Sequence, residues 1–482
     1  MPIPIPQINL GAILPELILV STACLVLILD VFSERRGHDR IAYISLAGVV
    51  TAAVFAGMPH DPFTTFSGMY GADRFTQFFK LIFLVGTGLT ILISVRYAQD
   101  EQINHGEYYA LLLFATVGMM FMAAGTDMMT IFMGLELLSI SLYVLAGYTR
   151  TRLESNEASL KYFLLGAFAS GFLLYGMALV YGLTGHTNLR EIAAVISGGI
   201  PNQTVLNIAA ALIIVGLGFK IAAVPFHQWT PDVYQGAPIP ITAFMSAGPK
   251  AAGLAAIFRV FIGAMPFEVD WAMWIAVMAI MTMTVGNIAA LVQKDVKRML
   301  AFSSIAHAGY ALVGVAAVTR EGVSGVMYYM LVYTFMNIGA FGILALVARK
   351  NEKRTGVDDL AGLASTNPVL AAVMAILVFS LAGIPPMAGF LGKFYVFMSA
   401  VNAGLYGLVL IAVINSAIGV YYYLRIIVAM YMRDKPEDDR LPPVVASPAL
   451  IAALVISVWG VLRLGIVPGR YIEMASAAFL GF

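Results

Sequence analysis

The sequence predicts an all-α protein that crosses a membrane about fourteen times, and three observations support this fold class. First, 60% of its 482 residues are hydrophobic and only 11% are charged, whereas soluble domains have about 45–50% and about 25%. Second, apolar runs recur along the whole chain. Third, the basic residues between these runs alternate from loop to loop. A cytosolic enzyme and a disordered chain are excluded, because so few charges cannot keep a chain of this length in water.

Net charge and cysteine content exclude further classes of protein. Lys and Arg number 28 and Asp and Glu 27, which leaves a net charge of +1. No basic field for nucleic acid exists. The single cysteine, Cys24, excludes an internal disulfide and any site of four thiolates. No G-x-G-x-x-G follows a strand and no H-E-x-x-H occurs. We therefore expect neither a metal nor a cofactor in this chain.

The spans are predicted from apolar runs that end at charged or Gly/Pro-rich breaks. The N-terminal sequence MPIPIPQIN lacks the basic region of a cleaved signal peptide, so the first run is expected to be a retained span. The fourteen predicted spans are 10–32, 41–57, 75–95, 108–125, 128–148, 159–184, 204–226, 239–263, 271–291, 300–318, 324–347, 368–402, 406–431 and 446–467.

Two of these spans are predicted to be broken. Run 368–402 would make a helix of roughly 52 Å at ~1.5 Å per residue, too long for a hydrocarbon core of ~30 Å. Its sequence GIPPMAG (383–389) should interrupt it. In the seventh span, Pro225 removes the backbone hydrogen bond to residue 221 and should kink the helix there.

The basic residues predict the orientation of the chain. Loops that follow odd-numbered spans carry 17 Lys or Arg, and the opposite side carries five. Cytoplasmic loops carry the excess of positive charge, so the odd loops are expected in the cytoplasm. Both termini then lie on the outer side, which requires an even number of spans and agrees with fourteen.

The charged residues inside the spans predict an internal repeat. Spans 7 and 12 each have a break and a lysine, and spans 5 and 10 contain Glu136 and His307. An offset of five spans inverts the second unit in the membrane, as in transporters with inverted repeats. We therefore divide the chain into an N-terminal part (1–107), a first five-helix repeat of spans 4–8 (108–263), a second of spans 9–13 (264–431) and a C-terminal loop and helix (432–482).

Four ionisable residues are candidates for a functional site. An ionisable residue at mid-membrane costs at least ~2.5–3.5 kcal/mol on insertion scales and usually faces the bundle interior or a wet cavity. Lys250 lies too deep in its span to reach the surface. Glu136 shares a polar helix face with Ser139 and Tyr143. Lys220 and Lys393 lie beside the two broken helices, where transporters build ion sites.

Other polar residues have a second, structural interpretation. His307 is a candidate for a proton path because its unperturbed pKa is near 6.5, but it could equally be a hydrogen-bonded core residue. His227 and Asp232 are either capping groups or relay groups. Near span ends, the structural alternatives are a side chain that reaches the surface or an ion pair. These alternatives apply to Lys80, Arg259 and Arg425.

Four stretches resemble a known family. GLELLSISLYVLAGY (134–148), GFKIAAVPFHQWTPDVYQGAP (218–238), QKDVKRMLAFSSIAHAGY (293–310) and AGIPPMAGFLGKFYVF (382–397) resemble the antiporter-like membrane subunits of respiratory complex I and of multisubunit cation/proton antiporters. Within this family the chain is most similar to the subunit N group, by its compact length, its end soon after span 14 and the lysine at position 393.

The resemblance implies a fold, a function and partners. It implies two inverted five-helix bundles with a central polar axis and one proton path. Glu136 would modulate Lys220, Lys250 would connect the halves, and Lys393 would be the terminal lysine. NAD, FMN, iron–sulfur clusters and quinone would be bound by other subunits. The partners would be neighbouring antiporter-like and small membrane subunits of complex I in a bacterial inner membrane.

Two alternative functions remain at this point. The chain could belong to a sodium/proton antiporter complex, although Glu136 is its only central acid and sodium sites usually need several oxygen ligands. It could also be a structural subunit that moves no protons.

Overall fold

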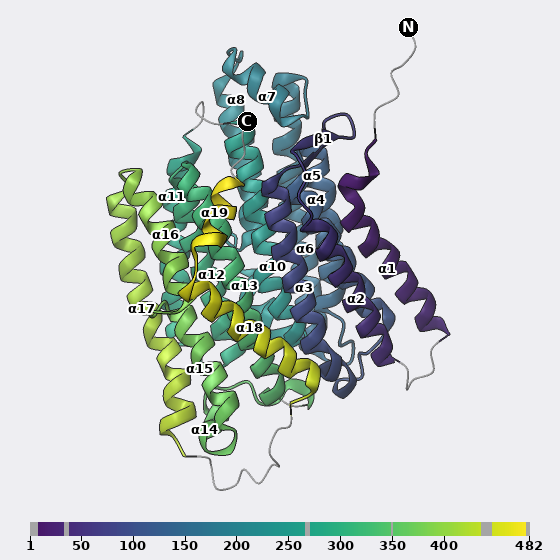
Figure 1. Ribbon diagram of the computed structural model, residues 1–482. Helices are drawn as coiled ribbons and strands as arrows, with labels where there is room; N and C mark the ends of the chain where they lie inside the picture. The colour runs from purple at the N-terminus through teal and green to yellow at the C-terminus, as the bar shows by residue number, and fades with distance from the viewer. Residues whose placement is uncertain (1–7, 33–37, 266–269, 349, 435–445, 479–482) are drawn as a thin grey trace.

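The computed structural model describes residues 8–32, 38–265, 270–348, 350–434 and 446–478, and nearly all of them are helical. Figure 1 shows one bundle in which the N-terminal helices lie at one edge and the helices of residues 368–432 lie at the other. The predicted all-α membrane fold is confirmed.

The N-terminal part contains three long helices and a hairpin. Its elements are η1 (Leu10–Ile13), α1 (Leu14–Val31), α2 (His38–Ala56), β1 (Phe63–Thr65), β2 (Tyr70–Ala72) and α3 (Arg74–Asp100). The strands are antiparallel, with Phe63 opposite Ala72. Asp73 begins α3 as an N-cap, because its carboxylate accepts a hydrogen bond of 2.8 Å from the Thr76 amide.

The predicted first repeat consists of long helices and two short ones. Its elements are α4 (Gly106–Ala124), α5 (Met128–Ala146), α6 (Leu153–Thr184), α7 (Leu189–Ser197), α8 (Gln203–Ile221), α9 (Trp229–Gly236), α10 (Ile239–Ile257) and the π-helical turn η2 (Phe258–Ile262). Helix α8 ends at Ile221, where Pro225 was expected to break the seventh span.

The remainder of the described chain is also built of long and short helices. Its elements are α11 (Trp271–Leu291), α12 (Val296–Ala316), α13 (Arg320–Ala348), η3 (Lys350–Glu352), η4 (Asp358–Leu360), α14 (Leu363–Thr366), α15 (Pro368–Ala382), α16 (Ala388–Asn402), α17 (Tyr406–Met432), α18 (Pro448–Ile466) and α19 (Gly469–Ala477).

The number of spans agrees with the prediction. Within the described residues, thirteen helices are long and apolar enough to cross a membrane, and α15 is a shorter apolar helix. Helices α15 and α16 occupy the predicted run 368–402, with residues 383–387 between them. The expected break is therefore confirmed, and the broken pair counts as the fourteenth span.

Contacts between loops agree with the alternation of the spans. Loops after odd-numbered spans meet one another through Arg152 and Glu352 and through Glu101 and Asn351. On the other side, Arg320 donates to the backbone of Ser476 at 3.0 Å. The prediction also counted basic residues that lie outside the described ranges: Arg35, Arg36, Arg349, Lys435 and Arg440. Which end faces the cytoplasm stays a prediction.

The centre of the bundle is formed by α10 and α12. Both helices have apolar windows that are buried throughout. Helix α10 is rich in Ala and Gly, and small residues let neighbouring helix backbones approach closely. It packs against α3, α8 and α13. A charge within the buried part of these two helices is therefore enclosed by protein.

Among the described residues, the elements outside the predicted spans are the β1–β2 hairpin, α7, α9, η3, η4, α14 and α19. Each of these strands and helices has nine residues or fewer and is therefore too short to cross a membrane. The hairpin has a local reason to form, because Gly68 takes a φ of +81° in its turn, a conformation that glycine adopts without strain.

Candidate functional site

Lys220 lies in the last turn of α8 and is buried. Its ammonium donates hydrogen bonds to Ser139 Oγ on α5 at 2.9 Å and to the Tyr162 hydroxyl on α6 at 3.5 Å. It also lies 5.8 Å from the centre of the Tyr162 ring. Tyr162 in turn stacks on Trp229 of α9, with ring centres 4.4 Å apart. Helices α5 and α6 therefore contact this lysine, and α9 packs behind Tyr162.

The break after α8 leaves backbone groups that need partners. Ala222 takes the left-handed conformation with a φ of 62°, which turns the chain out of the helix. The Val224 amide then donates to Thr282 Oγ1 at 2.9 Å, and the Trp229 indole donates to the Phe219 carbonyl at 3.2 Å. Specific hydrogen bonds therefore stabilise the break next to Lys220.

Glu136 lies on α5 and is partly buried. Its carboxylate accepts a hydrogen bond from Ser170 of α6. The predicted contact with Lys220 is indirect, because Ser139, one turn along α5, holds the ammonium. Among the described residues no carboxylate forms an ion pair with Lys220, although Glu136 is near enough to act on it by Coulomb attraction. Glu136 and Lys220 are therefore bound to different serines in this structure, Ser170 and Ser139.

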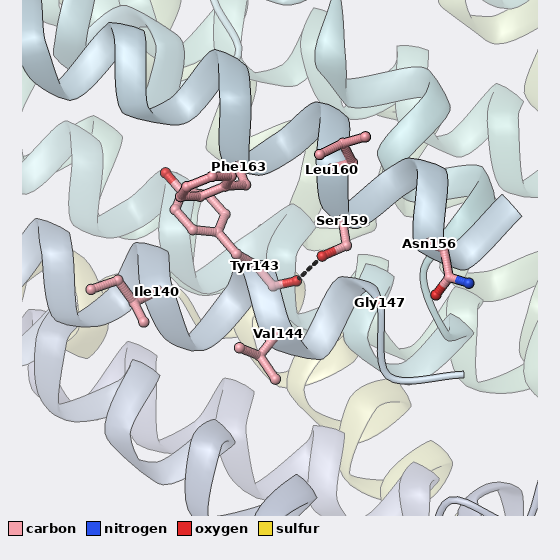
Figure 2. A pocket seen from close by; sticks show the side chains of 8 residues that line it. All are labelled: Ile140, Tyr143, Val144, Gly147, Asn156, Ser159, Leu160 and Phe163. Carbon is pink, nitrogen blue, oxygen red and sulfur yellow. Dashed lines mark hydrogen bonds between the residues drawn. The ribbon is translucent and has the colours of Figure 1, made fainter. Parts of the chain in front are cut away.

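Two grooves flank α6 near this region. The first lies between α5 and α6 and has a volume of about 430 Å³. Figure 2 shows Tyr143, Val144 and Phe163, which line it. Beside it, Ser159 Oγ donates to the Tyr143 carbonyl at 2.7 Å. The second, of about 340 Å³, lies between α6 and the break after α8. None of the five predicted site residues lines either groove, so the site is internal.

Lys250 is fully enclosed in the middle of α10. Its ammonium donates to the Ser304 carbonyl at 2.6 Å and to the Ser304 hydroxyl at 2.8 Å on α12. The expectation that this lysine lies too deep to reach the surface agrees with its 2% exposure. Lys250 therefore joins the predicted first repeat to the second.

His307 lies one turn after Ser304 on α12 and is buried among tyrosines. Its Nδ1 is 2.5 Å from the Tyr329 hydroxyl and its Nε2 is 2.9 Å from the Tyr423 hydroxyl. Tyr423 also shares a hydrogen bond of 2.5 Å with Ser303. Because each hydroxyl can donate or accept, the imidazole can carry its proton on either nitrogen and keep both hydrogen bonds.

Lys393 lies in α16, beyond the second break, and is buried. Its ammonium donates to the carbonyls of Leu381 at 3.2 Å and Ala382 at 3.0 Å, the last residues of α15. It also donates to Ser416 Oγ at 3.0 Å. The ring of Tyr310, on the same helix as His307, is centred 4.9 Å away.

These residues form an internal row, which we call the cation row: Lys220, Lys250, His307 and Lys393. Helix α12 is its connector, because Ser304 holds Lys250, His307 follows, and Tyr310 lies against Lys393. The buried hydroxyls of Tyr234 and Tyr333 lie near Ser304, the residue that holds Lys250.

Sequence reasoning identified the charged members of the row and missed most of their partners. Tyr329, Ser416 and Tyr423 come from other helices, 22, 23 and 116 residues away from the side chains that they contact. An isolated tyrosine or serine in an apolar run gives no local signal of such a contact. Ser303, Ser304 and Tyr310 could be found, because they share a helix face with His307.

The structure assigns the charges near span ends to structural contacts. Lys80 pairs with Glu16 at 2.9 Å, and Arg259 pairs with Asp73 at 2.8 Å. Both cations are buried, so the interpretation that they reach the membrane surface is wrong. Arg425 donates to the carbonyls of Leu291 and Gln293 at the end of α11.

Asp232 and His227 flank the start of α9. Asp232 forms ion pairs with Lys161 at 2.9 Å and Arg298 at 2.8 Å, and thereby ties α9 to α6 and α12. His227 lies in the break, and its Nδ1 has no hydrogen-bond partner among the described residues. A group of three possible metal ligands, Asp30, His105 and Glu107, includes neither of these residues and no member of the cation row.

Family profiles match this chain over most of its length. A profile described as NADH:quinone oxidoreductase/Mrp antiporter, TM, matches residues 125–419. Another, described as NAD(P)H-quinone oxidoreductase subunit 2 N-terminal, matches residues 8–96. The fold and the cation row thus define an antiporter-like membrane subunit of the respiratory type.

Individual relatives narrow the family assignment to one subunit of the complex. NADH-quinone oxidoreductase subunit N of Trichlorobacter lovleyi is 53% identical, over 98% of this chain and 97% of the relative. Subunit N of Rhodospirillum rubrum is 45% identical, over 89% of each. The chain belongs to the family of NADH-quinone oxidoreductase subunit N, an antiporter-like membrane subunit of complex I.

Solved structures agree with this assignment. A chain of respiratory complex I from Thermus thermophilus with bound aureothin has a TM-score of 0.82 and 35% identity, covering 96% of this chain and 100% of that one. A chain of the Mrp complex from Dietzia sp. DQ12-45-1b has a TM-score of 0.84 at 22% identity, covering 98% and 97%. This second likeness shows a shared fold.

Proposed function

We propose that this chain is a proton-translocating membrane subunit of NADH-quinone oxidoreductase. Protons cross the membrane through Glu136, the cation row and internal water. NADH oxidation and quinone reduction take place in other subunits, which hold NAD, FMN, iron–sulfur clusters and quinone. The chain itself is a non-redox part of a proton-translocating enzyme. The observation that carries this proposal is the row of buried lysines whose ammonium groups, among the described residues, donate hydrogen bonds to neutral hydroxyl and carbonyl oxygens.

The chemistry of a buried lysine supports a relay. Burial disfavours the charged form of lysine, and a nearby carboxylate favours it. An ammonium held by neutral oxygens inside the bundle can therefore lose its proton, whereas an ammonium paired with a carboxylate keeps it. Glu136 would favour protonated Lys220 when close, and separation, as observed here, would favour release.

The order of contacts supports a path along the row. A proton released by Lys220 would pass through internal water toward Lys250, where the Tyr234 and Tyr333 hydroxyls lie near Ser304. Ser304 and His307 then connect Lys250 with the tyrosines around Lys393. Neighbouring subunits would supply the driving force as conformational or electrostatic change, because this chain performs no redox step.

The setting follows from the family. We place the chain in the bacterial inner membrane, with both termini on the periplasmic side and with neighbouring antiporter-like and small membrane subunits of complex I as its partners. The two inverted repeats, 108–263 and 264–431, would present the two broken helices to opposite sides. Reporter fusions at Arg152 and Lys353 should be cytoplasmic and those at Asp61 external. An external signal at Arg152 would contradict this topology.

The proposal is tested by substitutions on one continuous helical segment. Lys250→Ala should strongly reduce protons pumped per electron in the assembled complex. Arg259→Ala, nine residues further along in η2, is the matched control, because Arg259 is engaged with Asp73 rather than with the row. Equal losses in two assembled variants would refute the specific role of Lys250. Normal pumping in Lys250→Ala would favour a purely structural subunit, and sodium-dependent pumping an antiporter.

A further inference from the structure

Glu352 is a buried acid outside the cation row that lies in a strained turn. It ends η3, directly after α13, and is 8% exposed. Asn351 and Glu352 have φ angles of 61° and 49°. Residues other than glycine pay a steric cost in this left-handed region. Two such residues in succession need strong contacts to hold the turn in place.

Three hydrogen-bond donors, from α12, α3 and α10, and the guanidinium of Arg152 meet the Glu352 carboxylate. Oε2 accepts from Lys297 of α12 at 2.6 Å and pairs with Arg152, before α6, at 3.1 Å. Oε1 accepts from the Tyr97 hydroxyl of α3 and from the backbone amide of Ile239 at 2.8 Å. Burial acts to raise the pKa of the Glu352 carboxyl, but Lys297 and Arg152 outweigh it and hold the pKa below its usual value. The carboxylate is therefore charged.

These contacts secure both sides of the turn between α9 and α10. Ile239 is the first residue of α10, and no side chain of its N-cap residue Pro238 caps the helix. Glu352 supplies the missing acceptor, and its negative charge favours a helix N-terminus. Lys297 donates in addition to the carbonyls of Gln235 and Ala237, at the end of α9, at 3.0 and 2.5 Å.

The same two helices meet again at the cation row. Lys250 lies eleven residues after Ile239 on α10, or about 16 Å at ~1.5 Å per residue. Ser304, which holds Lys250, lies seven residues after Lys297 on α12 and thus on nearly the same helix face. The contact of α10 with α12 is therefore fixed at one end by Glu352 and Lys297 and in the middle by Lys250 and Ser304.

We propose that Glu352 is a positioning residue that fixes the end of α9 and the start of α10 against α12, and thereby sets the placement of Lys250 beside Ser304. The inference rests on the proposed function for its consequence in pumping, but the structural effect can be measured separately. Glu352 acts through Lys297 and the amide of Ile239 and carries no proton itself.

The test uses Glu352→Gln in the intact complex. All four partners of the carboxylate are donors, so an amide must turn its own N–H groups toward donors and lose contacts. Glu101→Gln is the matched control, because Glu101 accepts from the Asn351 amide in the same cluster but contacts neither Lys297 nor α10. Hydrogen exchange is measured in residues 229–245 and, for comparison, in 388–402, together with protons pumped per electron.

In Glu352→Gln, exchange in 229–245 should become about tenfold faster, because those amides open locally. Exchange in 388–402 should stay as in wild type, and pumping per electron should fall while quinone reduction continues. Glu101→Gln should change none of these quantities. If Glu352→Gln does not assemble, Lys297→Gln should give the same exchange pattern, because it removes the other half of the pair.

Two results would overturn the inference. One is unchanged exchange in 229–245; the other is faster exchange with normal pumping per electron in a complex that loses pumping in Lys250→Ala. Normal pumping in Lys250→Ala would instead refute the proposed function, and the exchange result would still show whether Glu352 holds α10.

Discussion

The two broken helices of this protein share a backbone design and differ in where they carry charge. In each break the first half ends at a residue with left-handed conformation, Ala222 after α8 and Gly383 after α15, with φ of 62° and 85°. Each lies three residues before a proline, Pro225 or Pro386. Lys220, however, precedes its break in α8, whereas Lys393 follows its break in α16.

The contacts of the two lysines differ accordingly. Lys220 is held by hydroxyls, which can donate or accept and so suit either charge state of the amine. Lys393 is held by two carbonyls at the C-terminal end of α15, which only accept and where the helix dipole favours a cation. The comparison teaches that two breaks of similar backbone conformation hold their lysines in different electrostatic settings. Under the proposed function, Lys220 would be the residue suited to switching and Lys393 the one suited to holding a proton.

The largest effects are expected when either lysine is removed. Lys220→Ala and Lys393→Ala should each lower proton pumping per electron to below about a tenth of wild type, as for the loss of a proton-transfer group. Lys220→Arg should not restore pumping, because arginine stays charged. The measurement is proton uptake by vesicles that contain the complex, with assembly checked on native gels. Strong pumping by Lys220→Arg would refute a relay at this position.

Substitutions of Glu136 should have a smaller, graded effect that is confined to the first break. Glu136→Gln removes the negative charge that favours protonated Lys220 and should slow pumping several-fold, by about 1 kcal/mol or more. Glu136→Asp keeps the charge and should retain more activity. A structural hydrogen bond with Ser170 predicts the opposite order, since glutamine preserves its geometry better. Pumping per electron in the two variants separates these readings.

The serines beside the two lysines provide a third, still smaller contrast. Ser139→Ala leaves Lys220 with only the long contact to Tyr162, and a hydrogen bond to a charged group contributes about 1.5–3 kcal/mol. Ser416→Ala leaves Lys393 with both carbonyls. We expect a clear loss of pumping in the first variant and less than about a twofold loss in the second. Equal losses would remove the distinction between the two sites.

The smallest effects concern the left-handed residues of the breaks. Ala222→Gly relieves a steric cost of about 1–2 kcal/mol but adds unfolded-state entropy of about 0.5–1 kcal/mol, so stability should change little or rise. Gly383→Ala adds the steric cost and places a methyl 3.2 Å from the Lys393 side chain. Its melting temperature should fall. A stable Gly383→Ala complex with normal pumping would show that this turn tolerates a side chain.

Much of the fold could be predicted because the lipid bilayer restricts the structures that a chain can form within it. A bilayer requires continuous apolar helices, so their number and alternation are visible in the sequence. Both breaks were found from Pro225 and from the excessive length of run 368–402. The short helices α7 and α9 were missed because short amphipathic segments resemble loops.

Residues of the site could be predicted only where the sequence itself reveals an energetic cost, as it does for a charge within an apolar span. A lysine or glutamate in an apolar run is conspicuous, so Glu136, Lys220, Lys250 and Lys393 were found. Partners such as Ser416 come together only in the folded bundle. Glu352 was missed for the same reason, because a loop acid shows no sign of burial in the sequence.

Coupling between Glu136 and Lys220 is the most direct test of the account. Pumping per electron is measured in Glu136→Gln, Lys220→Ala, the double variant and wild type. If Glu136 acts only through Lys220, Glu136→Gln should cause no further loss once Lys220 is alanine, and the single effects will not add. Independent, additive losses from the two substitutions would contradict the account.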